Sequence, residues 1–222
     1  MIQVSEAFRS TYPGARVGLL AMSGVSNPSV DSSLERRKAE VEQELRRLYG
    51  GFERTQLKQL PTMQAYVQYY AKYEKTYHLL LQLESVAVKG KPLPSVAALV
   101  EAMFMAEVKN MLLTAGHDLV KVSKPLTLGV AAGGERYLGI RGREETCKAG
   151  DMIISDGEGI VSSVICGPDA RTRITPPTAS VLFTTYAPEG VDEAALRSHL
   201  ADIEEYVRLV SPEAVTEASQ VA

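Results

Sequence analysis

Residues 95–122 decide the fold of this chain, because the hydrophobic period changes within them. Their sequence is SVAALVEAMFMAEVKNMLLTAGHDLVKV. From Ser95 to about Ala115 the chain is apolar almost all round, which predicts a helix at the centre of the fold. We expect Ser95 to cap this helix and Gly116 to end it in the left-handed conformation. From residue 119 onward the apolar period becomes two, which predicts strands.

The second half of the chain is predicted to form a layered antiparallel sheet. Turns separate several of its strands, and we expect Gly133-Gly134-Glu135 and Asp156-Gly157-Glu158-Gly159 to be hairpin turns rather than phosphate-binding loops, because strands flank both. The expected strands are Leu119–Val122, Leu126–Val130, Arg136–Ile140, Met152–Ser155, Ile160–Cys166 and Ser180–Tyr186.

Upstream of residue 95 the pattern predicts one buried strand, Val17–Met22, followed by helices. Ser32 and Glu35 match a capping box that opens the first of these helices. The helix places one apolar stripe inward, formed by Leu34, Val41, Leu45 and Leu48.

A tyrosine-rich helix is expected after Pro61. Its tyrosines follow helical spacing on one face, and we expect them to pack on the core rather than to stack on bases. They are Tyr66, Tyr69, Tyr70, Tyr73 and Tyr77.

The order of elements, with helices first and strands later, predicts the α+β class. A last helix capped by Asp192 closes the chain, with Leu196, Leu200, Ile203 and Val207 inward. We expect residues 1–222 to form a single domain, in which a β-sandwich-like sheet carries packed helices.

Composition limits the classes of function. The chain has 222 residues, a net charge of −3, a pI near 5.7 and two separated cysteines. No apolar run approaches the length of a membrane span, and no metal-binding, P-loop or nucleophile-elbow motif is present. We therefore expect a cytoplasmic protein with no cofactor, no metal, no membrane association and no DNA partner. Any RNA contact must be local, because an acidic chain cannot coat RNA broadly.

Two short stretches carry candidate chemistry. Arg171 and Arg173 would project to one side of an extended segment, where their planar guanidinium groups suit phosphate or carboxylate. A charged sheet edge explains the same residues equally well. His117-Asp118 follows the expected helix, where the pair forms either a site or a solvated turn.

The order of several segments resembles a known family. Lys89-Gly-Lys-Pro-Leu-Pro94 leads to Leu99–Met103, then to Asp118, Gly134-Glu135, Gly150-Asp151 and Asp156, and finally to Ala170-Arg-Thr-Arg-Ile-Thr175 and Val181–Phe183. This set, over roughly residues 60–190, resembles the B3/B4 domain of the phenylalanyl-tRNA synthetase beta subunit, especially its solo relatives.

The resemblance implies a β-sandwich with flanking helices. It also implies binding of an aminoacylated tRNA 3′ end, with trans-editing by an aminoacyl-tRNA deacylase as the enzymatic form of that function. The residues expected at the site are Glu101, Phe104, His117, Asp118, Arg171, Thr172, Arg173 and Thr175.

The chain also departs from the family pattern. Phe104 replaces the pocket asparagine, Ala115 stands near the position of the pocket histidine, and Thr184 near that of the specificity-setting glutamate. The editing chemistry is therefore not carried over residue by residue, and the catalytic residues stay unassigned. Two alternatives remain: a non-enzymatic module that binds an amino acid, a nucleoside or another small ligand, and an interaction module that lost the site.

Overall fold

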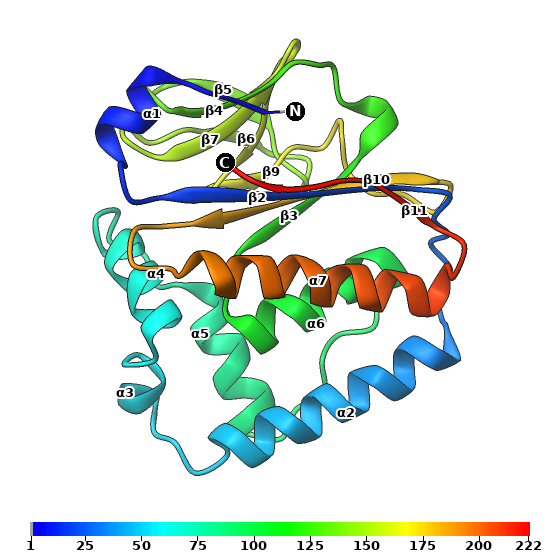
Figure 1. Ribbon diagram of the computed structural model, residues 1–222. Coiled ribbons are helices and arrows are strands. Elements are labelled where there is room, and N and C mark those ends of the chain that lie inside the picture. The colour runs from blue at the N-terminus through cyan, green and yellow to red at the C-terminus, as the bar shows by residue number, and fades with distance from the viewer. Residues whose placement is uncertain (1) are drawn as a thin grey trace.

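A four-stranded antiparallel sheet lies at the middle of the molecule (Figure 1). A computed structural model describes residues 2–222. The strand order is β11-β2-β10-β3, and the two central strands pair over their whole length, from Ser23 opposite Ser180 to Arg16 opposite Ala187. The four strands are β2 (Arg16–Ser23), β3 (Thr114–Asp118), β10 (Ser180–Ala187) and β11 (Val215–Val221).

A five-stranded sheet stacks on one face of this central sheet, in the order β1-β4-β7-β8-β9 (Figure 1). The hydroxyl group of Tyr186 on β10 lies 2.6 Å from that of Ser162 on β8, so the two sheets meet through paired side chains. A separate two-stranded ribbon joins β5 to β6. The strands are β1 (Ile2–Val4), β4 (Leu126–Val130), β5 (Arg136–Leu138), β6 (Glu144–Thr146), β7 (Met152–Asp156), β8 (Gly159–Ser163) and β9 (Gly167–Pro168).

Helices cover the other face of the central sheet (Figure 1). One hydrophobic core contains residues from Phe8 to Ala214, which confirms the α+β class with a sandwich-like pair of sheets. Helix α7 lies close against β2 at Gly18. The helices are α1 (Glu6–Thr11), α2 (Ser32–Tyr49), α3 (Arg54–Leu57), α4 (Pro61–Ala71), α5 (His78–Leu83), the π-helix η1 (Glu84–Val88), α6 (Ala98–Asn110), the 3-10 helix η2 (Leu119–Lys121) and α7 (Glu193–Val210).

The tyrosines of α4 and the following loop pack on the core, as expected. Their hydroxyl groups donate to groups on the sheets and loops: Tyr69 to Asp151 at 2.7 Å, Tyr70 to the Val164 carbonyl at 2.9 Å and Tyr77 to the Met111 carbonyl at 3.1 Å. These bonds satisfy the polar tip of each buried ring. The tyrosines do not share one helix, because α4 ends at Ala71 and the chain turns at Glu74 (φ 55°).

The central helix is shorter than predicted. Helix α6 starts at Ala98 and ends where Met111 adopts the left-handed conformation (φ 60°), so Gly116 is not its cap. Residues 114–118 form β3 instead, because they pair antiparallel with β10. The strand predicted at Leu119–Val122 is wrong, since most of it is η2. Leu99, Val108 and Leu112 are buried, as a central helix requires, whereas Met103 is half-buried.

Helix α2 differs from its prediction in its cap and in its buried face. Asp31, rather than Ser32, accepts the first N–H groups, and Leu48 is 42% exposed. Lys38 and Glu42 are buried because they bind the connection that precedes α6. Glu42 accepts from the N–H of Leu93 at 2.7 Å, and Lys38 donates to the Ser95 hydroxyl at 2.9 Å.

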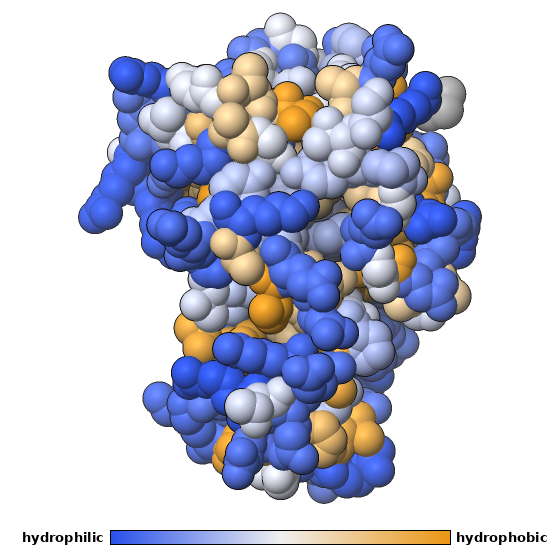
Figure 2. All heavy atoms as spheres, turned by 90° about the vertical axis from the view of Figure 1, so that its left-hand side faces the viewer, coloured by the Kyte–Doolittle hydropathy of each residue, from blue (hydrophilic) through white to orange (hydrophobic). Residues whose placement is uncertain are grey.

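The outer surface is mainly hydrophilic on the face shown in Figure 2, where apolar residues form small separate patches. No helix within residues 2–222 combines the length and apolar character of a membrane span.

Candidate functional site

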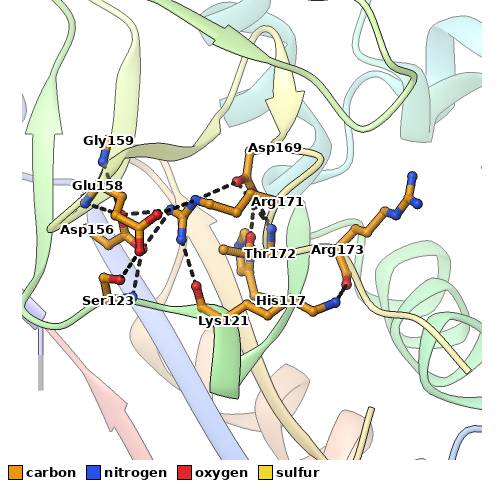
Figure 3. A network of polar contacts seen from close by, with 10 residues as sticks. All are labelled: His117, Lys121, Ser123, Asp156, Glu158, Gly159, Asp169, Arg171, Thr172 and Arg173. Atoms are coloured by element: carbon orange, nitrogen blue, oxygen red, sulfur yellow. Dashed lines mark hydrogen bonds and ion pairs between the residues drawn. The ribbon is translucent and has the colours of Figure 1, made fainter. Parts of the chain in front are cut away.

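The edge strand β3 and the segment 169–175 bring most of the expected site residues together. His117 forms an isolated antiparallel bridge with Arg173, and the N–H of Asp118 donates to the Thr172 carbonyl at 2.6 Å. The two segments lie 55 residues apart in sequence at the His117–Thr172 contact. We call His117, Asp118, Asp169, Thr172 and Arg173 the edge cluster (Figure 3 shows all but Asp118).

Three buried side chains of the edge cluster, Asp169, Thr172 and His117, contact one another in series. The Thr172 hydroxyl contacts Asp169 Oδ1 at a short distance and lies 2.7 Å from His117 Nδ1. A hydroxyl group donates only one proton. If Thr172 donates to the carboxylate, then Nδ1 must be the protonated nitrogen of His117. We assign this tautomer, which leaves a lone pair on Nε2.

The Nε2 atom of His117 is buried and has no hydrogen-bond partner among residues 2–222. The pKa of His117 is lowered to about 4, chiefly by burial, which outweighs the opposing charge of Asp156 and is helped by the Arg171 charge. The imidazole is therefore neutral at pH 7. An unsatisfied buried acceptor costs about 1–3 kcal/mol, and such groups concentrate at functional sites.

The guanidinium group of Arg171 is bound by other groups of the protein and does not line an open pocket. Its Nη2 lies 2.8 Å from both carboxylate oxygens of Asp156, and its Nη1 donates to the Lys121 carbonyl at 2.7 Å (Figure 3). Asp156 also accepts three backbone N–H groups at 2.9–3.1 Å. Burial opposes ionisation of Asp156, but the Arg171 hydrogen bond and the N–H groups hold the pKa of Asp156 below its ordinary value.

The prediction that both arginines project to one side is wrong. Figure 3 shows Arg171 directed toward Asp156 and Arg173 directed away from it. Residues 170–172 are bent rather than extended, because Asp156 holds the guanidinium group of Arg171 while β3 holds Arg173. Arg173 is exposed, and within residues 2–222 its guanidinium group has no carboxylate in ion-pair range.

Thr175 lies beside the start of α6. Asn27 donates to the Thr175 carbonyl at 3.1 Å and accepts from the N–H of Leu99 at 3.0 Å. A hydroxyl group at Thr178 joins the segment to Asp118, since it donates to Asp118 Oδ2 at 2.9 Å and accepts from the N–H of Thr175 at 2.9 Å.

Glu101 does not join the edge cluster. It is buried and binds Lys38 Nζ at 2.8 Å and the N–H of Val96 at 2.7 Å, so its carboxylate faces α2 and the preceding connection. Phe104 is half-buried on α6. These two expected site residues therefore belong to the helix layer, and no polar contact connects Glu101 to Arg171 or Arg173 within residues 2–222.

Two hollows lie elsewhere on the surface. One has a volume of about 450 Å³ between α2 and residues 92–95, and Lys38 and Glu42 are part of its wall. The other, of about 760 Å³, is lined mainly by β1, α1 and the residues that follow α1. Neither hollow is lined by Arg171 or Arg173.

Sequence reasoning did not place Asp169, Asp156 or Asn27 among the site residues. Asp169 stands three residues before Thr172, which is the spacing of an aspartate that caps a local turn. Asp156 likewise caps a local turn, because its side chain accepts from the N–H groups of Glu158 and Gly159 in the hairpin. Asn27 carried no local signal, because its partners at Leu99 and Thr175 are distant in sequence.

Comparisons with known proteins give a distant similarity in structure. No family model and no curated protein matches the chain. Among solved structures, an N-terminal fragment of the phenylalanyl-tRNA synthetase beta subunit from Pyrococcus horikoshii is similar, with 10% identity and a TM-score of 0.49. The alignment covers all of this chain and 50% of that fragment, so this chain spans half of the fragment's length. Similarity at this level is not an argument for a shared activity.

Proposed function

We propose that this chain binds the aminoacylated 3′ end of a tRNA at the edge cluster. The observation that carries the proposal is the buried, unpartnered Nε2 of His117, held as an acceptor by Thr172 and Asp169. A ribose hydroxyl, an α-ammonium group or a water molecule would donate the hydrogen bond that Nε2 lacks. The exposed guanidinium group of Arg173 offers the charge that a terminal phosphate needs.

The position of His117 agrees with the family resemblance. Ala115 and Thr184, which stand near the family's pocket histidine and glutamate, are directly paired between β3 and β10. His117 is two residues from Ala115 on the same strand and therefore on the same face of the sheet. This face carries one histidine close to the position where the family has one.

Binding is better supported than hydrolysis. Ester hydrolysis by this site would need a water molecule whose proton moves to Nε2 while its oxygen attacks the acyl carbon, and the proton would then pass to the leaving ribose oxygen. A base with a pKa of about 4 is weak at pH 7, because effective general bases have pKa values near the working pH. His117 is also fully buried, so segment 169–175 would have to move before the 3′ end could reach Nε2, for binding as well as for hydrolysis.

The test is a binding assay with tRNA in its uncharged and aminoacylated forms. We expect Arg173→Ala to weaken binding of both forms and His117→Gln to weaken the aminoacylated form more. Arg197→Ala, which removes an exposed arginine of α7, serves as the control. Equal binding by the wild type, Arg173→Ala and Arg197→Ala would contradict the proposal. A deacylation assay with mischarged tRNA, run beside it, reports whether hydrolysis accompanies binding.

The second candidate is binding of a small polar ligand in the hollow beside Lys38. Its volume of about 450 Å³ lies within the range of ligand pockets, and its wall carries both charges. Thermal unfolding with a panel of amino acids and nucleosides tests this candidate. A ligand that stabilises the wild type but not Ala39→Trp, which would fill the hollow, would support it.

A further inference from the structure

Strand β1 forms a free edge of the five-stranded sheet, because β4 is its only neighbour in that sheet. The two strands run parallel, and the N–H of Ser5 donates to the Leu128 carbonyl at 3.0 Å. Successive residues of a strand direct their backbone groups to opposite sides of it. Gln3 therefore binds β4 as Ser5 does, whereas Ile2 and Val4 direct their N–H and C=O groups outward. No group of residues 2–222 binds these outward groups.

An apolar hollow lies beside this edge. Its volume is about 760 Å³, and it extends from β1 to the end of β11, since Ile2, Val4 and Ala222 are all part of its wall (Figure 1). The rings of Phe8 and Tyr12 line it as well. This volume is typical of sites that hold a few apolar groups. Recognition by strand addition uses the same two elements, a free strand edge for main-chain bonds and a neighbouring pocket for a side chain.

The charge at the hollow is positive. Arg9 is the only charged residue in its wall. This arginine is exposed, and no carboxylate of residues 2–222 lies within ion-pair distance of it, although Glu6 precedes it by one turn of α1. A second cation is close, since Lys72 Nζ lies 5.2 Å from the centre of the Tyr12 ring. The hollow therefore favours a partner that carries a negative charge beside an apolar group.

The outward backbone groups distinguish a peptide from a lipid. A fatty acid would fill the hollow and pair its carboxylate with Arg9, but it has no donor for the carbonyl groups of Ile2 and Val4. Covering those carbonyls without a donor would cost the desolvation free energy of each. An extended peptide offers alternating N–H and C=O groups that match the edge of β1, and it also supplies the apolar and acidic side chains.

We propose that the free edge of β1 binds an extended peptide segment, which places an apolar side chain in the hollow and a carboxylate on Arg9. Because side chains of a strand alternate between its faces, residues two apart in the peptide share the hollow and the residue between them faces solvent. The inference is independent of the proposed function, because the edge cluster lies on β3, at the edge of the central sheet opposite to β11.

The experiment uses a synthetic peptide of alternating valine and threonine with one terminal glutamate, blocked at both ends. Binding to the full chain is measured by fluorescence anisotropy, and NMR of the isotope-labelled chain follows the amide signals of Ile2 and Val4. Two N-methylated versions of the peptide, one methylated at every valine and one at every threonine, each lack one row of N–H donors. We expect the affinity of only one version to fall, by about tenfold, because only one row faces β1.

Protein variants test the charge and the place of binding. Arg9→Ala should weaken binding of the parent peptide by about two- to fivefold, which is the effect of an exposed ion pair. The matched control is Arg47→Ala, which removes an exposed arginine of α2 and should leave the affinity unchanged. Peptide binding should also shift the amide signals of Ile2 and Val4.

Several results would overturn the inference. They are no binding of the parent peptide up to about 1 mM, or equal binding of the parent and both methylated versions. If decanoate shifts the two amide signals and the peptide does not, the hollow is a site for fatty acids. If raising the concentration of the chain alone shifts them, a second copy occupies the edge.

Discussion

Replacing Arg171 by alanine should destabilise the fold, because this arginine holds three loops together. It binds both oxygens of Asp156 at 2.8 Å and the Lys121 carbonyl at 2.7 Å, and the Asp156 side chain is fully buried. Breaking a buried ion pair costs about 3–5 kcal/mol. Arg171 is 32% exposed and Asp156 keeps its backbone N–H partners, so we expect about 2–3 kcal/mol.

Urea unfolding at pH 7 measures this cost. Arg173→Ala is the matched control, because Arg173 lies two residues away and its guanidinium group has no ion-pair partner in the described chain; it should change the free energy of unfolding by less than about 0.5 kcal/mol. Arg171→Lys should fall between the two, since one ammonium group cannot reach both Asp156 and the Lys121 carbonyl as Nη2 and Nη1 of Arg171 do. If Arg171→Ala and Arg173→Ala were equally stable, Arg171 would not be a structural residue.

The pH dependence provides a second check on the same pair. The pKa of Asp156 is lowered in the folded state, so its contribution is present above the unfolded pKa of about 3.9 and is lost as the pH falls through the folded value. The stability difference between wild type and Arg171→Ala should therefore persist at pH 5 and shrink below about pH 3. A difference that was unchanged at pH 2.5 would contradict the ion-pair explanation.

Three further predictions concern single sites. Thr172→Val should lower the free energy of unfolding in urea by about 1–3 kcal/mol, because it leaves Asp169 and Nδ1 of His117 without their shared hydroxyl group. An unchanged free energy of unfolding would refute the hydrogen-bonded series Asp169–Thr172–His117. His117 and His199 each have a pKa lowered to about 4 by burial, so the stability that each contributes is complete above about pH 6.5 and is lost as the pH falls toward 4, by up to ~3 kcal/mol each. Burial raises the pKa of Glu107 to about 8, which acts in the opposite direction over this range, so the wild type is compared with His117→Gln/His199→Gln; an equal change in unfolding free energy between pH 7 and pH 4.5 in both proteins would contradict the prediction. Gly18→Ala should lower the free energy of unfolding by about 1–3 kcal/mol, because the new Cβ would lie 2.9 Å from Leu196 Cδ1. The control is Gly51→Ala, whose new Cβ meets nothing within 4 Å and which should leave stability nearly unchanged when both variants are compared by thermal unfolding.

The sequence alone determined those parts of the fold that depend on local periodicity and local capping. The strand β2, the helix α7 with its Asp192 cap and the hairpin that turns at residues 156–159 all agree with prediction. The tyrosines also pack as predicted, since a ring with one polar tip is stable in a core when that tip finds an acceptor. For the strand, the helix and the hairpin, the residues that decide the structure are neighbours in the chain.

Tertiary pairing decided the rest. Residues 114–118 continue an apolar run and would extend α6, yet they form β3 because β10 offers a complete row of backbone partners. The same pairing places His117 beside Thr172, 55 residues later in the chain. Arg171 faces away from Arg173 because the carboxylate of Asp156, on another hairpin, binds its guanidinium group. Alternation along a strand predicts the side of a residue only while the segment stays extended, and residues 170–172 are bent where Arg171 binds Asp156.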